Sequence, residues 1–201
     1  MRFVLASASP ARRTVLRNAG LEPVIRVSGV DEDAVAAALP DPTPAELVTA
    51  LAKAKAEAIA ADEQDAVVVG CDSMLLTADG QVQGKPGTVD KARERWRRMA
   101  GTTATLLTGH AVLKVVDGRI AARAADHEAT VVRFGTPTEA ELEAYLATEE
   151  PLQVAGAFTL DGRGGWFVDG IDGDPSSVIG ISLPLTRRLL RQVDIAVSDI
   201  W

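Results

Sequence analysis

The chain has 201 residues, of which 47% are hydrophobic, and a formal net charge of −7. A chain of this length and apolar content can bury a substantial core, so we expect a folded protein. The acidic balance argues against a nucleic-acid-binding surface, because a phosphate backbone requires Lys and Arg concentrated over a broad face. Any polyanion bound here must therefore be small and must meet a local cluster of cations.

The cysteine and histidine content limits the redox setting and the metal chemistry. A single cysteine, Cys71, excludes an internal disulfide and favours a reduced, cytoplasmic setting. The two histidines, His110 and His127, form no metal-ligand motif, so we expect them to be structural or exposed. Apolar runs fall short of the ~20 residues that span a bilayer, and the first residues do not resemble a signal peptide. We therefore expect no association with a membrane.

The N-terminal residues combine a strand, a serine-rich turn and the start of a helix. The pattern predicts a strand at Arg2–Ala6, with Ser9 as the N-cap of the helix and Pro10 as its first residue. Free backbone N–H groups at this helix start would lie near the hydroxyl of Ser7, and Arg12 would follow one turn later. This arrangement is typical of an anion site. The alternative is that Ser9 only caps the helix and the arginine is solvated.

Three consecutive acids, Asp31, Glu32 and Asp33, follow a short strand predicted at Glu22–Val27. Such a run usually forms a solvated loop or begins a helix. The alternative is that one of the acids faces Asp72 and helps to hold a divalent cation, which prefers hard oxygen ligands.

A helix with clear start signals comes next. We predict Thr43 as its N-cap, Pro44 as its first residue, Glu46 as the capping-box partner of Thr43, and an end near Ala61. Lys55 lies near the buried stripe of this helix. A Lys beside an apolar face normally extends into solvent, whereas a Lys held at a ligand site would bind phosphate.

The stretch from Ala66 to Pro86 organises the chain. Its first residues, AVVVG, lack polar alternation and predict a central strand that is buried on both faces and ends at Asp72. A hairpin that turns at Asp79–Gly80 then leads to Lys85 in a Gly-Lys-Pro turn. This placement suggests that the carboxylate of Asp72 and the ammonium of Lys85 have a functional role. The alternative is that Asp72 caps a turn and Lys85 is solvated.

The remaining elements alternate helices, strands and glycine-rich turns. We expect a helix at 88–99, two paired strands within 102–134 that turn at Asp117–Gly118, a helix capped by Thr136 or Thr138, a strand at Gly165–Ile171, and short helices at Ser176–Ile181 and Leu185–Val193. The Gly- and Asp-rich turns around residues 161–164 and 172–175 either let the backbone approach a ligand or are simply tight turns.

Four separated segments carry a resemblance to a known family. They are LASASPARR (Leu5–Arg13), VGCDSMLL with GKP (Val69–Leu76 and Gly84–Pro86), EPLQVAGAFTLDGRGGWFVDGIDGD (Glu150–Asp174) and SSVIGISLP (Ser176–Pro184). In this order they resemble the Maf family of nucleoside triphosphate pyrophosphatases. The resemblance implies an α/β fold with a mixed twisted sheet and flanking helices. It further implies that residues 1–201 form an elongated, two-lobed single domain with a central cleft, similar to the inosine-triphosphate pyrophosphatases.

The resemblance also implies an activity and assigns roles to residues. The implied activity is hydrolysis of a nucleoside triphosphate to the monophosphate and pyrophosphate, and it requires a divalent metal. The resemblance also implies that the protein could form a homodimer. The residues that match phosphate-binding and substrate-binding positions are Ser7, Arg12, Lys55 and Lys85. Asp72 matches the family's proton acceptor and, with Glu32, would hold Mg²⁺ or Mn²⁺, so that Asp72 or a water on that metal is the base.

Three positions that differ between family subtypes leave the base preference open. Thymidine- and uridine-type members carry Arg, Thr and Gln there, and methylguanosine-type members carry Trp, Gln and Glu, whereas this chain has Ala11, Ser73 and Asp161. Ala11 would leave a roomier pocket, and Asp161 could accept hydrogen bonds from a base. We therefore expect altered selectivity, which could extend to non-canonical or modified nucleotides.

A second class of function is a nucleotide-sensing regulator of cell division, because the family has been associated with arrest of septum formation. The retained acids and Lys85 favour an enzyme, since a sensor could lose the catalytic acid. A nucleic-acid-binding module is a third class, which the net charge disfavours.

Overall fold

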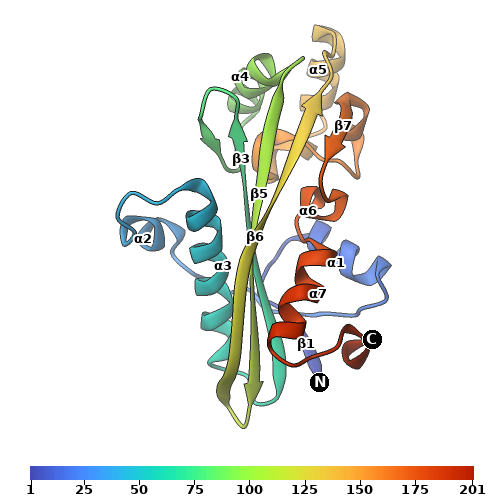
Figure 1. The fold of residues 1–201 in the computed structure, drawn as a ribbon. Coiled ribbons are helices and arrows are strands. Elements are labelled where there is room, and N and C mark those ends of the chain that lie inside the picture. Colours follow the sequence, from blue (N-terminus) through green and yellow to red (C-terminus); the bar gives the residue numbers. More distant parts are fainter. The chain divides into compact units, whose positions relative to one another are not determined.

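The computed structural model describes all 201 residues and contains one mixed seven-stranded sheet flanked by helices (Figure 1). The strands are β1 (Arg2–Leu5), β2 (Val24–Ile25), β3 (Ala66–Thr77), β4 (Val82–Gln83), β5 (Thr103–Val116), β6 (Arg119–Phe134) and β7 (Val168–Asp172). Their order is β2-β1-β3-β5-β6-β7, and β4 pairs with β3 beside this path. Strand β1 pairs in parallel with β2 and β3, whereas the pairs β3–β4 and β6–β7 are antiparallel. The α/β fold with a mixed sheet is as the sequence predicted.

The helices complete two compact units. They are α1 (Pro10–Asn18), α2 (Glu32–Ala37), α3 (Pro44–Ala60), α4 (Val89–Met99), α5 (Glu139–Leu146), α6 (Pro175–Ile179) and α7 (Leu183–Gln192), with short 3-10 helices between and after them. The first unit comprises residues 1–72, 108–128 and 180–201, and the second comprises residues 73–107 and 129–179. Strands β3, β5 and β6 each contribute residues to both units. None of the helices has the length and apolar character needed to cross a membrane.

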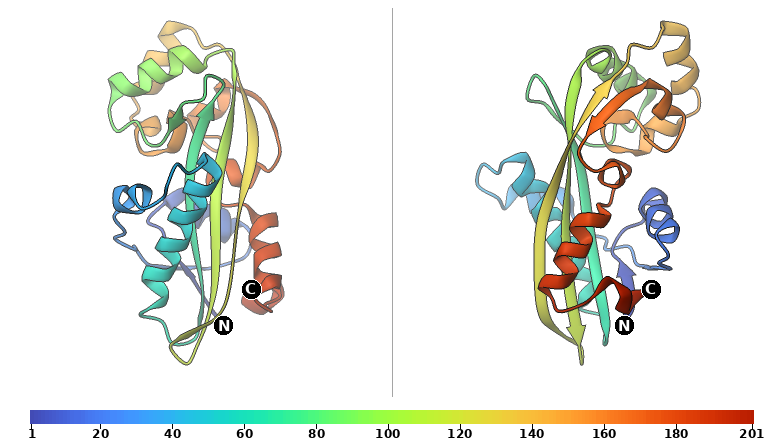
Figure 2. Two further views of the ribbon diagram at one scale, coloured as in Figure 1. Left: turned by 60° about the vertical axis from the view of Figure 1, so that its left-hand side comes forward. Right: turned by 45° about the vertical axis from the view of Figure 1, so that its right-hand side comes forward.

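In the first unit, helices cover both faces of the strands. One face of β1, β3 and β5 packs against Ala52, Ala56 and Ile59 of α3. Helix α7 lies on the opposite side of the strands from α3 in both sets of views (Figures 1 and 2). This burial on two faces explains the unbroken apolar run at the start of β3, all of which is buried.

Two glycines bring α3 unusually close to the sheet. A Cβ atom added at Gly70 of β3 would lie 2.2 Å from the carbonyl oxygen of Ala52, and one added at Gly109 of β5 would lie 2.2 Å from that of Val48. Any side chain at either position would therefore push the helix away. The close approach also brings the next turn of α3, which carries Lys55, near the end of the buried part of β3.

The second unit has its own core around Trp96 of α4. The indole ring makes edge contacts with Phe134, Tyr145 and Phe167, and its Nε1 donates to the carbonyl oxygen of Ala157 at 2.7 Å. Aromatic edge contacts of this kind stabilise a core beyond the area they bury. The indole N–H is also satisfied, so the ring can be fully buried.

The start signals of α1, α3, α4 and α5 were predicted accurately, whereas α7 begins at Leu183 instead of Leu185 and three strand boundaries were wrong. Thr43 caps α3 with a complete capping box, Thr88 caps α4, and Thr138 rather than Thr136 caps α5. Strand β2 is shorter than Glu22–Val27. Strand β3 does not end at Asp72 but continues to Thr77, because the strand extends beyond its apolar run. Strand β7 begins at Val168 instead of Gly165, because the glycines before it allow a 3-10 helix over Arg163–Phe167.

Candidate active site

Asp72 is the last residue that β3 contributes to the first unit, and it is only 7% exposed. Successive side chains of a strand alternate between its faces, so Asp72 shares the face of Val68 and Gly70. That face packs against α3. The carboxylate of Asp72, which follows the apolar run of β3, therefore lies in a partly enclosed position beneath α3.

Lys55 of α3 joins two carboxylates. Its Nζ lies 2.6 Å from Oδ1 of Asp72 and 2.7 Å from Oε1 of Glu32. The Lys55 side chain is only 12% exposed, whereas that of Glu32 is 54% exposed. Lys55 therefore does not extend freely into solvent, and it lies at the point where the two acids converge.

The run of three acids begins a helix, as one interpretation of the sequence held. Asp31 is the N-cap of α2, and its Oδ1 accepts a hydrogen bond from Ala34 N at 3.0 Å. Glu32 is the first residue of that helix and reaches Lys55. Of the three acids, Glu32 is the one that forms an ion pair with Lys55.

Burial controls the protonation of Asp72. Loss of solvation raises the pKa of this carboxyl, and it outweighs the opposing attraction of Lys55 and Arg12. The nearby negative charge of Glu32 raises the pKa further. A carboxylate with a raised pKa binds a proton more readily, which suits a general base.

Arg12 lies at the start of α1, where it is firmly held. Its Nη1 donates to Oγ of Ser7 and to the carbonyl oxygen of Cys71, both at 2.9 Å, and its Nε donates to the carbonyl oxygen of Gly180 at 2.8 Å. The N–H of Ser9 also donates to Oγ of Ser7, at 3.2 Å. The interpretation of Arg12 as a solvated side chain is therefore wrong. Ser7 and Arg12 are oriented together beside the N-terminus of a nine-residue helix, a geometry that favours anions.

The acids of this site can hold a divalent cation only with help from a ligand. Glu32 and Asp72 direct one oxygen each toward a single point, which Nζ of Lys55 occupies. No group of three His, Cys, Asp or Glu residues is arranged to hold a metal ion. Mg²⁺ commonly binds through one or two carboxylates together with phosphate oxygens of a substrate. Because Lys55 lies between the two acids, that mode of binding would require Lys55 to move away and phosphate oxygens to complete the ligand set.

The other predicted site residues lie in different places. Ala11 is a half-buried residue of α1 in the first unit, whereas Ser73, Lys85 and Asp161 belong to the second unit. Lys85 and Asp161 are exposed, and Ser73 is half-buried in β3. Within the second unit, the turn that carries Lys85 is fixed through its preceding carbonyl, which accepts from Nη1 of Arg95 at 2.6 Å. Lys85 is thus a free cation on a fixed backbone.

The geometry defines an α/β protein with a serine and an arginine held together at a helix start and a buried carboxylate that is paired with a lysine. The profile of the Maf-like protein family matches residues 2–193, so the chain belongs to the Maf family. A nucleoside triphosphate pyrophosphatase of Saccharopolyspora erythraea is 66% identical over all of this chain and 97% of its own length. Proteins with the same name from Rhodococcus opacus and Mycolicibacterium gilvum are 66% and 55% identical, over 99% and 100% of this chain and 95% and 98% of their own lengths.

Sequence reasoning missed the groups that hold Arg12. Two of its partners are the carbonyl oxygens of Cys71 and Gly180, and a carbonyl carries no signal of residue type. Gly180 was available as a signal, because it lies in the SSVIGISLP segment. Its φ is +134°, and an added Cβ atom would lie 3.2 Å from Cγ of Arg12. The backbone conformation therefore favours glycine there, and an added Cβ atom would press on the side chain of Arg12.

Proposed function

We propose that this chain, a nucleoside triphosphate pyrophosphatase of the Maf family, hydrolyses the bond between the α- and β-phosphates and releases the monophosphate and pyrophosphate. The observation that carries the proposal is the pairing of buried Asp72 with Lys55 in the same unit as the Ser7–Arg12 pair. The reaction class is the one named for all three relatives. The names of these relatives do not specify the bond that is cleaved or the products, which we propose here.

The residues divide the work between holding charge and moving a proton. Ser7 and Arg12 hold phosphate oxygens at the start of α1, where the helix dipole also favours negative charge. Lys55 neutralises a further phosphate oxygen when it exchanges a carboxylate partner for the substrate. Neutralisation matters because catalysis of phosphoryl transfer consists mostly of positioning and electrostatic stabilisation.

Asp72 accepts the proton of the attacking water. Its raised pKa strengthens it as a base, and its burial limits competition from solvent. Mg²⁺ or Mn²⁺, held by Asp72, Glu32 and phosphate oxygens, would supply Lewis-acid stabilisation of the charge that develops on the phosphates. Lys85 is a further candidate for binding phosphate.

The test is release of pyrophosphate from a panel of canonical and modified nucleoside triphosphates with Mg²⁺ or Mn²⁺. Asp72→Asn should lower kcat by about 10²–10⁴, the usual contribution of a general base. Asp33→Asn is the matched control, because Asp33 is an exposed acid of α2 next to Glu32. Wild-type turnover in folded Asp72→Asn would refute the role of Asp72. Tight nucleotide binding without any release of pyrophosphate would instead favour the nucleotide-sensing regulator.

The proposed selectivity depends on Ala11, Ser73 and Asp161, which match neither family subtype. We expect activity to extend to nucleotides with modified bases, because Ala11 leaves space and the carboxylate of Asp161 accepts hydrogen bonds. Ala11→Arg and Ala11→Trp should each narrow the range of accepted bases. A clean preference of the wild type for dTTP and UTP would contradict this expectation.

A further inference from the structure

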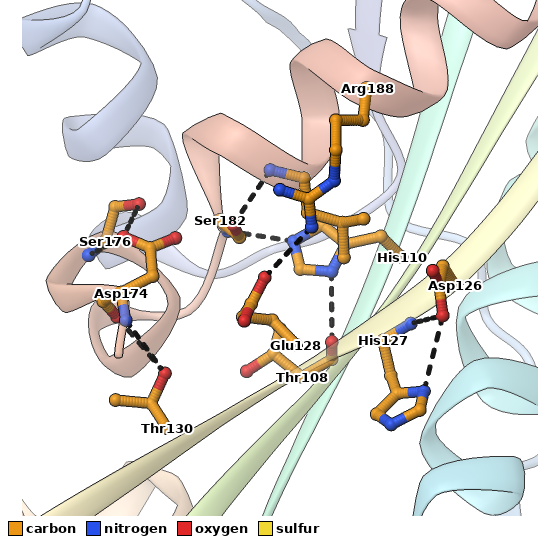
Figure 3. A network of polar contacts seen from close by, with 11 residues as sticks. Thr108, His110, Asp126, His127, Glu128, Thr130, Asp174, Ser176, Ser182 and Arg188 are labelled. Atoms are coloured by element: carbon orange, nitrogen blue, oxygen red, sulfur yellow. Dashed lines mark hydrogen bonds and ion pairs between the residues drawn. The ribbon is translucent and has the colours of Figure 1, made fainter. Parts of the chain in front are cut away.

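A histidine that the proposed chemistry does not use lies fully buried in the first unit. His110 of β5 has no exposed surface, although its imidazole is polar. Figure 3 shows the ring between Thr108 and Ser182, and Ser182 is the N-cap of α7. The ring therefore connects the central strand β5 to the segment that leads into the last long helix.

Two backbone groups define the protonation of this ring. The N–H of Ser182 lies 2.8 Å from Nε2 of His110, and the carbonyl oxygen of Thr108 lies 3.0 Å from Nδ1. A peptide N–H can only donate and a carbonyl oxygen can only accept. Nε2 must therefore carry the free lone pair, and Nδ1 must carry the proton. His110 is the neutral Nδ1–H tautomer.

The segment that His110 holds also holds Arg12. Gly180, two residues before Ser182, accepts from Nε of Arg12 at 2.8 Å and packs against the side chain of that arginine. Ile181, between them, is fully buried. The Oγ of Ser182 is committed to capping α7, where it accepts from Leu185 N at 3.0 Å. The position of the Gly180 carbonyl is thus fixed on one side by the bond from Ser182 to His110.

An apolar residue could fill the space at this position, but it could not accept a hydrogen bond. Burying an imidazole requires partners for both nitrogens, and a leucine would leave the N–H of Ser182 without its acceptor. What the histidine adds is a directional bond that fixes residues 180–182. We propose that His110 is a positioning residue, which orients Arg12 for phosphate through Ser182 and Gly180. This inference rests on the proposed role of Arg12.

Two amide substitutions at His110 distinguish the contribution of Nε2 from that of Nδ1. The amide of Gln can place its oxygen near the position of Nε2, whereas the shorter amide of Asn reaches only the position of Nδ1. His110→Asn should therefore lose the bond from Ser182 and raise the KM for the triphosphate about tenfold with little change in kcat. His110→Gln should restore KM to within about threefold of the wild type. Equal KM values in the two folded variants would overturn the proposal.

A double-mutant cycle tests whether the effect passes through Arg12. His110→Asn should change KM less than about twofold in an Arg12→Met background, because the group being oriented is gone. Additive effects on KM would show that His110 acts independently of Arg12 and would overturn the proposal. An Arg12→Met protein with the wild-type KM would refute the phosphate role of Arg12 itself, which distinguishes failure of the proposed function from failure of this inference.

The tautomer can be measured in the unmodified protein. Long-range ¹H–¹⁵N NMR spectra of the imidazoles should show one ring with a protonated Nδ1 and an unprotonated Nε2 at neutral pH. The chain has only two histidines, so His127→Gln assigns the signal. An Nε2–H tautomer or an imidazolium at His110 would overturn the proposal without any need for a stable His110 variant.

Discussion

The ammonium of Lys55 lies 2.6 Å from the carboxylate of Asp72, yet the pKa of Asp72 is raised. A close cation normally lowers the pKa of an acid. Burial reverses the outcome here, since Asp72 is only 7% exposed and the second acid at Lys55, Glu32, adds a like charge. The charge of Lys55 therefore offsets only part of the rise in the pKa of Asp72 that burial causes.

The first prediction concerns the pH dependence of activity. Asp72 must be ionised to accept a proton, so kcat/KM should fall as the pH decreases through its raised pKa, above the ordinary value of about 3.9. Glu32→Gln removes a charge that raises this pKa and should move the acid limb to lower pH. Lys55→Met removes a charge that lowers it and should move the limb to higher pH. A shift of the acid limb in the same direction in both variants would contradict the assignment of that limb to Asp72.

The second prediction concerns stability. Because its pKa is raised on folding, Asp72 binds protons more tightly in the native state than in the unfolded state. The stability of the native state therefore decreases as the pH rises through the interval between the two pKa values, and the cost persists at neutral pH. Asp72→Asn should raise Tm at pH 7 while activity is lost. At a pH below both pKa values the difference in Tm should shrink, and a lower Tm of the variant at pH 7 would count against the argument.

The third prediction concerns the contact between α3 and β3. Gly70→Ala introduces a Cβ atom 2.2 Å from the carbonyl oxygen of Ala52, so the helix must shift. We expect a loss of about 1–3 kcal/mol in the free energy of unfolding, as is typical of overpacking. Activity should also fall, because the shift displaces Lys55. Gly84→Ala is the control for stability, since an added Cβ atom there meets nothing within 4 Å. Equal denaturation midpoints for the two variants would be inconsistent with the close contact.

The fourth prediction concerns the single thiol. Burial raises the pKa of Cys71 to about 11, and its side chain is fully buried. At pH 8 it should therefore react with a thiol reagent only in denaturant, and Cys71→Ala should keep the contact of Arg12 with the carbonyl at position 71. Rapid modification of the native protein with loss of activity would show an accessible thiol instead.

Local signals in the sequence predicted much of the fold. Caps such as Thr43 depend on residues within one turn, so tertiary contacts rarely override them. The boundary of β7 was missed because two glycines in the preceding 3-10 helix carry almost no preference for one backbone conformation.

The candidate site was harder to predict from the residues alone. Asp72 was singled out as the predicted end of a buried strand, although β3 continues to Thr77. The same reasoning left Lys55 and Arg12 with solvated alternatives. The exposure of a side chain can be predicted from its own segment only when its partners lie there, whereas the partners of Lys55 lie on α2 and β3. The link through His110 was invisible, because a single histidine in an apolar strand carries no motif.

Arg12 and the carbonyl of Gly180 that orients it are separated by 168 positions in the chain. Translation proceeds from the N-terminus, so the serine-rich turn leaves the ribosome long before its anchor exists. Contacts this distant in sequence form only after a large loop is closed. A nascent chain would therefore hold the turn and the arginine without the bond that orients them. Nucleotide binding should begin only after the segment before α7 has left the ribosome and has docked against Arg12.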